Sequence, residues 1–430
     1  MTLSEKTDWM PDYLDLLNAQ RKLGYTVEAA IADIADNPFD AGASVCHIDM
    51  ITRDVAAKTA KVIDSIIFAD NGRGMNMHEL SKALVPASTG RIRKFTNELG
   101  YFGVGLVASG LSLGNRIEVY TRGEQGDLHS YLDWNEKYKN NSPINMVRPC
   151  TTKESVGVLD AYLRGAKTGT VVWISNLQLT SKKYDVMISE IKYHLSTTYY
   201  GLKDKYKITF DGKEIKPWDF IEKNDSAYSS DVKVYNVARD SKGNPIDAQI
   251  TLQLSYVYED NRNRWYEIMG RTNENQGGAL VRNGRMLTRG DMMGIAKKNP
   301  AHNALRFVLS YNDTVLDNHI FALNVQKDKC QIIDSKFKIW LDAEVKLFIK
   351  EVILPLNKKY RVNTPKTGGT NGRRSSASVP VSVLRSRAIA TNPVITKLHQ
   401  LDVDNLTAFE ALTLVRDLHV QSKKFVEEAN

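Results

Sequence analysis

Apolar positions recur every three or four residues near the start of the chain and predict a helix there. Residues 28–37 read EAAIADIADN, in which the alanines favour a helix and two isoleucines form an apolar stripe. We expect the helix to end before Pro38, because proline disfavours helical geometry in the residue that precedes it. Asp33 and Asn37 lie four residues apart and so share one face. This face could hold a water molecule beside a hydrated magnesium ion, or it could be an ordinary polar face.

A nearly continuous apolar run over 62–69 predicts a buried strand that breaks at Asp70 into the turn DNGRG. Gly72 and Gly74 would let the backbone approach a ligand closely. A carboxylate at the end of the strand, such as that of Asp70, can accept a hydrogen bond from an exocyclic amine.

Three glycines open an apolar helix in residues 99–114, which read LGYFGVGLVASGLSLG. Free N–H groups at such a helix start, together with the helix dipole, suit phosphate oxygens. The spacing of Gly100, Gly103 and Gly105 also matches a dinucleotide fingerprint. However, this segment does not open a βαβ unit near the N-terminus.

Alternating positions over 117–175 predict strands, most clearly at 117–122 and 170–175. We expect a mixed sheet with helices on one face. A helix is predicted at 184–201, and 206–219 forms a hairpin that turns at Asp211-Gly212.

A second α/β unit is predicted over about 230–355, with strands at 232–237 and 248–257 and a hairpin that turns at Asn283-Gly284. Its last helix is expected to be partly buried through five apolar residues: Ile339, Leu341, Val345, Phe348 and Val352.

The positive charge of the chain is concentrated in one stretch near its C-terminal end. The net charge is +8, and Lys358–Arg387 carries eight basic residues without an acid, so the rest of the chain is formally neutral. Residues 356–394 have too few apolar residues to fold alone, and we expect a basic linker that either solubilises the chain or contacts DNA phosphates. An amphipathic helix follows and could dock on a protein partner.

Residues 1–27 are either a strap that crosses to a second subunit or a helix that caps its own domain.

The remaining composition is that of a soluble globular protein, since 42% of the residues are hydrophobic and 25% are charged. No apolar run is long enough to span a membrane and no signal peptide is evident, so we expect a cytoplasmic protein with no membrane partner. Cys46, Cys150 and Cys330 are few, odd in number and far apart, which argues against a disulfide framework or a zinc site.

The order of the motifs DNPFDAGA, DNGRGM, LGYFGVGLVAS and TGTVV over residues 28–173 resembles that of the GHKL ATPases. This superfamily includes DNA gyrase B subunits, ninety-kilodalton heat-shock chaperones, MutL, MORC proteins and sensor histidine kinases. The resemblance implies an α+β two-layer sandwich, the Bergerat fold, followed by a transducer-like α/β domain. The expected domains are 1–225, 226–356, a linker at 357–394 and a helical segment at 395–430.

The resemblance also implies roles for individual residues. Asn37 corresponds to the magnesium ligand, Asp70 to the residue that binds the adenine amine, and Thr170 to a residue near Asp70 and the adenine edge. The other implied nucleotide-binding residues are Gly72, Gly74, Met75, Ser88, Thr89, Arg91, Gly100, Tyr101, Phe102, Gly103, Val104 and Gly105. Residues 84–98 correspond to the ATP lid. A transducer lysine that touches the γ-phosphate would be Lys327 or Lys329.

One position departs from the family pattern. The hydrolytic base is a glutamate in most of these ATPases, and the matching residue here is Asp33, whose side chain is one methylene shorter. A positional error of about 1 Å can cost roughly a hundredfold in rate, so we expect slow turnover. Asp36 is a poorer candidate for the base. It directly precedes Asn37, and because a helix turns about 100° between adjacent residues, the two side chains point in different directions.

These observations predict an ATP- and Mg²⁺-dependent homodimerising switch that closes a clamp, most plausibly on DNA or a DNA-bound complex, as in MORC-like or phage-defence ATPases. Two alternatives stay open: a chaperone-like ATPase that acts on proteins, and a regulatory module that binds ATP with little hydrolysis.

Overall fold

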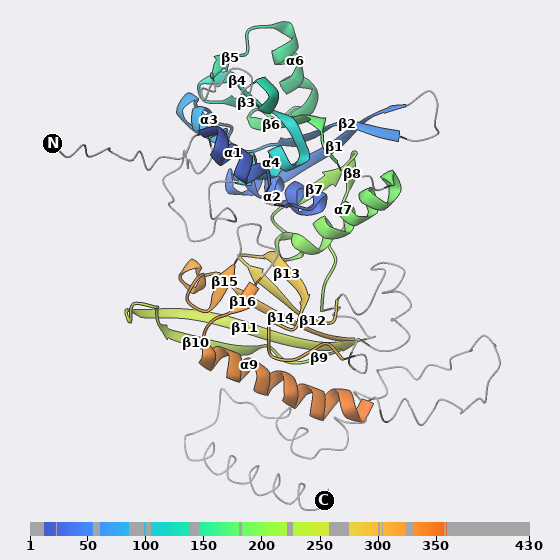
Figure 1. The fold of residues 1–430 in the computed structure, drawn as a ribbon, viewed down its shortest axis with the longest axis vertical. Helices are drawn as coiled ribbons and strands as arrows, with labels where there is room; N and C mark the ends of the chain where they lie inside the picture. Colours follow the sequence, from blue (N-terminus) through green and yellow to red (C-terminus); the bar gives the residue numbers. More distant parts are fainter. Residues whose placement is uncertain are drawn as a thin grey trace, which may run out of the picture. The chain divides into compact units, whose positions relative to one another are not determined.

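The computed structural model describes residues 13–22, 24–54, 61–85, 99, 105–136, 146–179, 183–221, 227–257, 275–299, 302, 304–323, 330–356 and 358. The chain divides into two compact units, Met1–Lys223 with Tyr228–Asn363, and Asn224–Ala227 with Thr364–Asn430. The first unit contains both large sheets (Figure 1). Among the described residues, no helix is both long and apolar enough to span a bilayer.

The first sheet has eight strands in the order β5-β4-β3-β6-β2-β1-β7-β8. The strands are β1 (Val45–Asp54), β2 (Lys61–Asp70), β3 (Gly114–Gly123), β4 (Gly126–Asp133), β5 (Arg148–Pro149), β6 (Gly169–Leu177), β7 (Lys207–Phe210) and β8 (Lys213–Glu214). Neighbouring strands are antiparallel except β1 and β7, which are parallel. The predicted strands at 62–69, 117–122 and 170–175 are thus confirmed as β2, β3 and β6.

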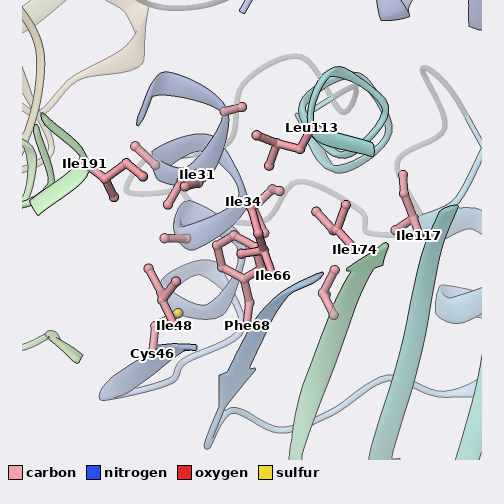
Figure 2. Packing of buried hydrophobic residues seen from close by; sticks show 14 of the residues in the cluster. Ile31, Ile34, Cys46, Ile48, Ile66, Phe68, Leu113, Ile117, Ile174 and Ile191 are labelled. Carbon is pink, nitrogen blue, oxygen red and sulfur yellow. The ribbon is translucent and has the colours of Figure 1, made fainter. Parts of the chain in front are cut away.

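Helices cover both faces of this sheet, which corrects the prediction that they lie on one face. The main core is formed with α1 (Tyr13–Arg21), α2 (Val27–Asp40), α3 (Met77–Ala83), α4 (Gly105–Leu113) and α7 (Tyr184–Thr198). Figure 2 shows this packing, in which side chains of α2 and α4 meet those of the sheet. Residues alternate in β2: Ile66 and Phe68 join this core, whereas Ile67 and Ala69 pack with Leu159 of α6 (Lys153–Tyr162) in a second cluster.

Helix α1 packs on its own domain, as one of the two alternatives for the N-terminal segment predicted. Leu17 is fully buried in the main core, and the guanidinium of Arg21 lies 5.3 Å from the ring centroid of Trp134. Residues 1–12 lie outside the described part of the chain.

Helix α2 continues through Pro38, so the prediction that the helix ends before this proline is wrong. Proline has no N–H, and the carbonyl of Ile34 therefore loses its usual donor four residues later. The side-chain nitrogen of Asn37 donates to that carbonyl at 3.2 Å. This bond replaces the missing one, and the last turn of the helix forms up to Asp40.

The second sheet has six strands, with β10-β11-β14-β12-β13 in order and β9 paired to β11. They are β9 (Ala227–Ser229), β10 (Lys233–Arg239), β11 (Pro245–Val257), β12 (Gly277–Arg282), β13 (Arg285–Asp291) and β14 (Leu305–Tyr311). A separate pair consists of β15 (Phe321–Leu323) and β16 (Cys330–Ile332). The sheet confirms the predicted strands and the hairpin at Asn283-Gly284, where both residues have positive φ angles, 51° and 81°.

Helix α9 (Ser335–Phe348), continued by a π-helical turn at Ile349–Ile353, lies along this sheet (Figure 1). The ring of Phe337 packs edge-on against Tyr235 of β10, with centroids 5.1 Å apart. Leu341, Val345 and Phe348 are buried as predicted. Ile339 is 70% exposed, so its predicted burial is wrong. The helical phase places Phe337 against the sheet instead, and Ile339, two residues on, points about 160° away.

Candidate functional site

Asp33 lies on α2 with its carboxylate buried, at 4% exposure. The hydroxyl of Tyr25 donates to Asp33 Oδ2 at 3.2 Å. Burial and the negative charge of Asp33 raise the pKa of Tyr25 well above its usual value, so the hydroxyl keeps its proton and remains a donor. Gly105, the first residue of α4, packs against the same carboxylate: a Cβ atom at this glycine would lie 2.8 Å from Oδ2. Asp33 is therefore held in place by groups from two other segments.

Asp36 is also buried, at 1% exposure, but its carboxylate is engaged elsewhere. Its Oδ1 accepts a bond from Arg285 Nε at 2.6 Å and one from the Tyr199 hydroxyl at 2.7 Å. Burial opposes the charge on Arg285, but Asp36, followed by Tyr199 and Asp33, outweighs it and raises the pKa of the guanidinium. Asp36 therefore serves as the buried anionic partner of an arginine from the second sheet.

Asn37 is half-buried one turn after Asp33. Because its amide nitrogen donates to the Ile34 carbonyl, its oxygen Oδ1 remains as the atom that can meet a cation or water. A neutral carboxamide oxygen is a ligand type that Mg²⁺ accepts, and this ion usually keeps several waters and binds phosphate oxygens as well. The residue thus fits a single-ligand magnesium site. Among the described residues, no three histidine, cysteine, aspartate or glutamate side chains cluster so that they could hold a metal ion.

Asp70 ends β2 with its side chain buried, at 6% exposure. Its Oδ1 accepts a hydrogen bond from the backbone N–H of Gly72 at 2.7 Å. A Cβ atom at Gly72 would lie 2.9 Å from that oxygen and 3.1 Å from the carbonyl oxygen of Ala41, just after α2. The glycine is therefore required for the turn to sit between the aspartate and the end of α2.

The hydroxyls of Thr121 and Thr170 lie next to the turn that follows β2. Thr121 Oγ1 of β3 accepts from the N–H of Met75 at 2.8 Å and lies 3.3 Å from Thr170 Oγ1 of β6. Gly74 precedes Met75 with a φ of 71°, and a Cβ atom there would lie 2.2 Å from the Arg122 carbonyl oxygen. Thr121 was not predicted as a site residue, because only the cross-strand register of β3 and β6 places it opposite Thr170.

The end of α2 is hydrogen-bonded both to the turn after Asp70 and to Leu99, the residue before the glycine segment. The carbonyl of Ala41 accepts from the N–H of Arg73 at 3.3 Å, and Asp40 Oδ1 accepts from the N–H of Leu99 at 2.7 Å. Asn71 Oδ1 accepts from the N–H of Ser44 at 3.0 Å, which fixes the loop after α2. One helix therefore carries Asp33 and Asn37 and anchors both the turn after Asp70 and the residue before the glycine segment.

Several predicted site residues lie outside the described part of the chain: Ser88, Thr89, Arg91, Gly100, Tyr101, Phe102, Gly103, Val104, Lys327 and Lys329. The basic segment after Lys358 and the predicted C-terminal helix lie outside it as well. The three cysteines, Cys46, Cys150 and Cys330, are free thiols.

A comparison with protein families finds a match over residues 25–162 to the family described as "Histidine kinase-, DNA gyrase B-, and HSP90-like ATPase". The matched range runs from Tyr25 through α2, the turn after Asp70 and α4 to the end of α6. No curated protein matches the chain.

Proposed function

Residues 25–162 match the histidine kinase-, DNA gyrase B- and HSP90-like ATPase family, and we propose that the chain is a slow, Mg²⁺-dependent GHKL ATPase that dimerises on binding ATP and acts as a clamp. The observation that carries the proposal is the arrangement along α2, where buried Asp33 lies one turn before Asn37 and against Gly105.

Asp33 is proposed as the general base that takes a proton from the attacking water. A base needs a free lone pair near the water and a fixed orientation. The Tyr25 hydroxyl donates to Oδ2 at 3.2 Å, and this bond fixes the orientation of the carboxylate that we propose accepts the proton. Asp36 is unsuited to this role, because its Oδ1 accepts from both Arg285 and Tyr199.

Asp70 is proposed to accept a hydrogen bond from the adenine amine. The N–H of Gly72 bonds to Oδ1, and a carboxylate has about four lone-pair sites, so it can accept a second donor. The Thr121–Thr170 pair holds the N–H of Met75 close by, which keeps the turn open for the base.

Asn37 would hold Mg²⁺ through Oδ1, and the ion would neutralise charge on the phosphates when bound. Gly105 starts α4, so its neighbouring N–H groups and the helix dipole can face the phosphates. Gly100 and Gly103, the lid residues Ser88, Thr89 and Arg91, and either Lys327 or Lys329 complete the proposed phosphate contacts.

DNA is the proposed target of the clamp. The stretch Lys358–Arg387 carries eight basic residues and no acid, and basic side chains bind the phosphate backbone without reading sequence. Deleting residues 358–430 should abolish salt-sensitive DNA binding. DNA binding that is unchanged by the deletion would contradict the role of this stretch, and a full chain that binds no DNA would favour a target that is a protein.

Phosphate release tests the hydrolytic role. Asp33→Asn should lower kcat by roughly 10²- to 10⁴-fold with little change in ATP affinity. Glu28→Gln, a change in the first turn of the same helix, is the matched control and should hydrolyse ATP like the wild type. Equal rates for the wild type and Asp33→Asn would contradict the assignment of the base.

Light scattering with and without a non-hydrolysable ATP analogue tests the dimer. The mass should double only with the analogue. A mass that does not change while the analogue binds would remove dimerisation from the proposal.

A further inference from the structure

The turn Arg282–Arg285, which joins β12 and β13 of the second sheet, contacts the ATPase domain at two places. Arg285 Nε donates to Asp36 Oδ1 on α2 at 2.6 Å. Arg282 Nη1 donates to the carbonyl oxygen of Leu99 at 3.3 Å. Leu99 immediately precedes the glycine segment that starts at Gly100. Both contacts therefore reach the segments that build the nucleotide site.

Both arginines are buried together with their anionic partners. The side chains of Arg285 and Asp36 are 6% and 2% exposed. Arg282 forms a second ion pair with Asp317, at 2.9 Å between Nε and Oδ2, and both side chains are 3% exposed. The attraction between buried charges repays their desolvation only when the geometry is good. The Arg285–Asp36 pair meets this condition, because it is also a hydrogen bond of 2.6 Å, and it therefore defines the position of the turn more sharply than a surface contact would.

The backbone of the turn is packed as closely as its side chains. A Cβ atom at Gly201, just after α7, would lie 2.4 Å from the carbonyl oxygen of Gly284. Glycine at position 201 thus allows the tip of the turn to press against the end of the ATPase domain. On another side, Gly284 and Val281 line a cavity of about 180 Å³, together with Tyr200, Phe220 and Met286. The turn is therefore tightly packed on one side and has free space on another.

The contacts of Arg285 with Asp36 and of Arg282 with Leu99 both lie next to proposed nucleotide-binding residues. Asp36 lies between Asp33 and Asn37 on α2, so its bond to Arg285 holds the helical turn that carries both of them. Leu99 is held from two sides, because its N–H donates to Asp40 at 2.7 Å and its carbonyl accepts from Arg282. A displacement of about 1 Å at a catalytic group can cost roughly a hundredfold in rate.

We propose that Arg285 and Arg282 are positioning residues of the ATPase site, through which the second sheet sets α2 and the start of the glycine segment. This inference rests on the proposed function. It adds a role for the β12–β13 turn that does not involve contact with the nucleotide. It also makes the turn the route by which a bound nucleotide affects the second sheet.

Arg285→Met in the full chain tests the inference, with Arg289→Met as the matched control. Arg289 lies on the same strand, but it donates to Thr197 of α7 at 2.6 Å and does not reach α2. We expect Arg285→Met to lower kcat by roughly 10- to 100-fold, with a smaller change in ATP affinity. Arg289→Met should retain the wild-type kcat even where its melting temperature falls.

Removing one partner of a buried ion pair can unfold a protein, so the double variant Asp36→Leu/Arg285→Met accompanies the single one. It removes both charges of this ion pair, and Asp33 then lacks only the longer-range attraction of Arg285. It should fold and still show the reduced kcat, because the link between α2 and the turn is lost. A double variant with the wild-type kcat would overturn the inference.

Hydrogen exchange on the wild type supplies a readout that needs no variant. Peptides covering residues 277–291 should exchange more slowly when a non-hydrolysable ATP analogue is bound. Unchanged exchange in a protein that demonstrably binds the analogue would refute the coupling while leaving the ATPase proposal intact. If the wild type bound no ATP, the proposed function itself would fail.

Discussion

Gly169 lies so close to Asp70 that a Cβ atom at residue 169 would be 2.0 Å from the Asp70 carbonyl oxygen. Gly169 also has a φ of 156°, which L-residues rarely adopt. The first residue of β6 therefore determines where the end of β2 can lie. It does so directly beside the proposed adenine ligand.

Gly169→Ala should displace the end of β2 and weaken ATP binding as well as stability. The new methyl group meets backbone rather than a movable side chain, so the strand has to shift. Calorimetric titration with ATP and thermal unfolding measure the two effects. Gly126→Ala is the control, since Gly126 also has a positive φ, 87°, but has nothing within 4 Å of its added Cβ. It should lose stability only, and a loss of ATP affinity as large as that of Gly169→Ala would argue against the specific contact.

Gly105→Ala should reduce hydrolysis more than folding. The added Cβ would lie 2.8 Å from Asp33 Oδ2, so the carboxylate has to turn away from the position that Tyr25 supports. We expect kcat to fall by roughly tenfold or more. Gly157→Ala in α6 meets nothing within 4 Å and should raise stability by up to about 1 kcal/mol without affecting kcat. A wild-type kcat for Gly105→Ala would show that Asp33 tolerates the displacement.

Asp70→Asn tests the adenine contact with little disturbance to the fold, because the amide oxygen can still accept from the N–H of Gly72. Its amide nitrogen would face the exocyclic amine as a second donor. We expect the Kd for ATP to rise by roughly 10- to 100-fold, the effect of about 1.5–3 kcal/mol for a hydrogen bond to a charged group. Titration of the variant with ATP measures the change, and an unchanged Kd would contradict the assignment.

Glu118 should contribute stability that is lost in acid. Burial raises its pKa, but hydrogen bonds from His129, Arg116 and Tyr120 outweigh burial and hold the pKa at about 2, below its usual 4.5. A lowered pKa means that the contribution is complete above pH 4.5 and disappears as the pH falls toward 2. Glu118→Gln should therefore be less stable at pH 7, by at most about 3 kcal/mol.

Urea unfolding at a series of pH values measures this effect. The difference between the wild type and Glu118→Gln should shrink as the pH falls from 4.5 toward 2. Glu124→Gln, at an exposed position in the turn after β3, should follow the wild type throughout. A constant difference across this range would mean that Glu118 acts through packing rather than charge.

Features that depend on neighbouring residues could be predicted from the sequence. The 3.6-residue period identified α2 and α7, and the nearly continuous apolar run identified β2. Asp211-Gly212 and Asn283-Gly284 indicated their hairpins because both residues of such a turn need positive φ angles. The motif order also indicated the family that residues 25–162 match, since it depends only on residue type and spacing along the chain.

Contacts between distant segments were decided by the tertiary structure alone. Helix α6 covers the second face of the sheet because β2 is apolar on both faces. Asp36 and Arg285 are 249 residues apart and pair only when the two sheets have formed. Local periodicity carries no information about such partners, because their proximity arises from the packing of whole elements.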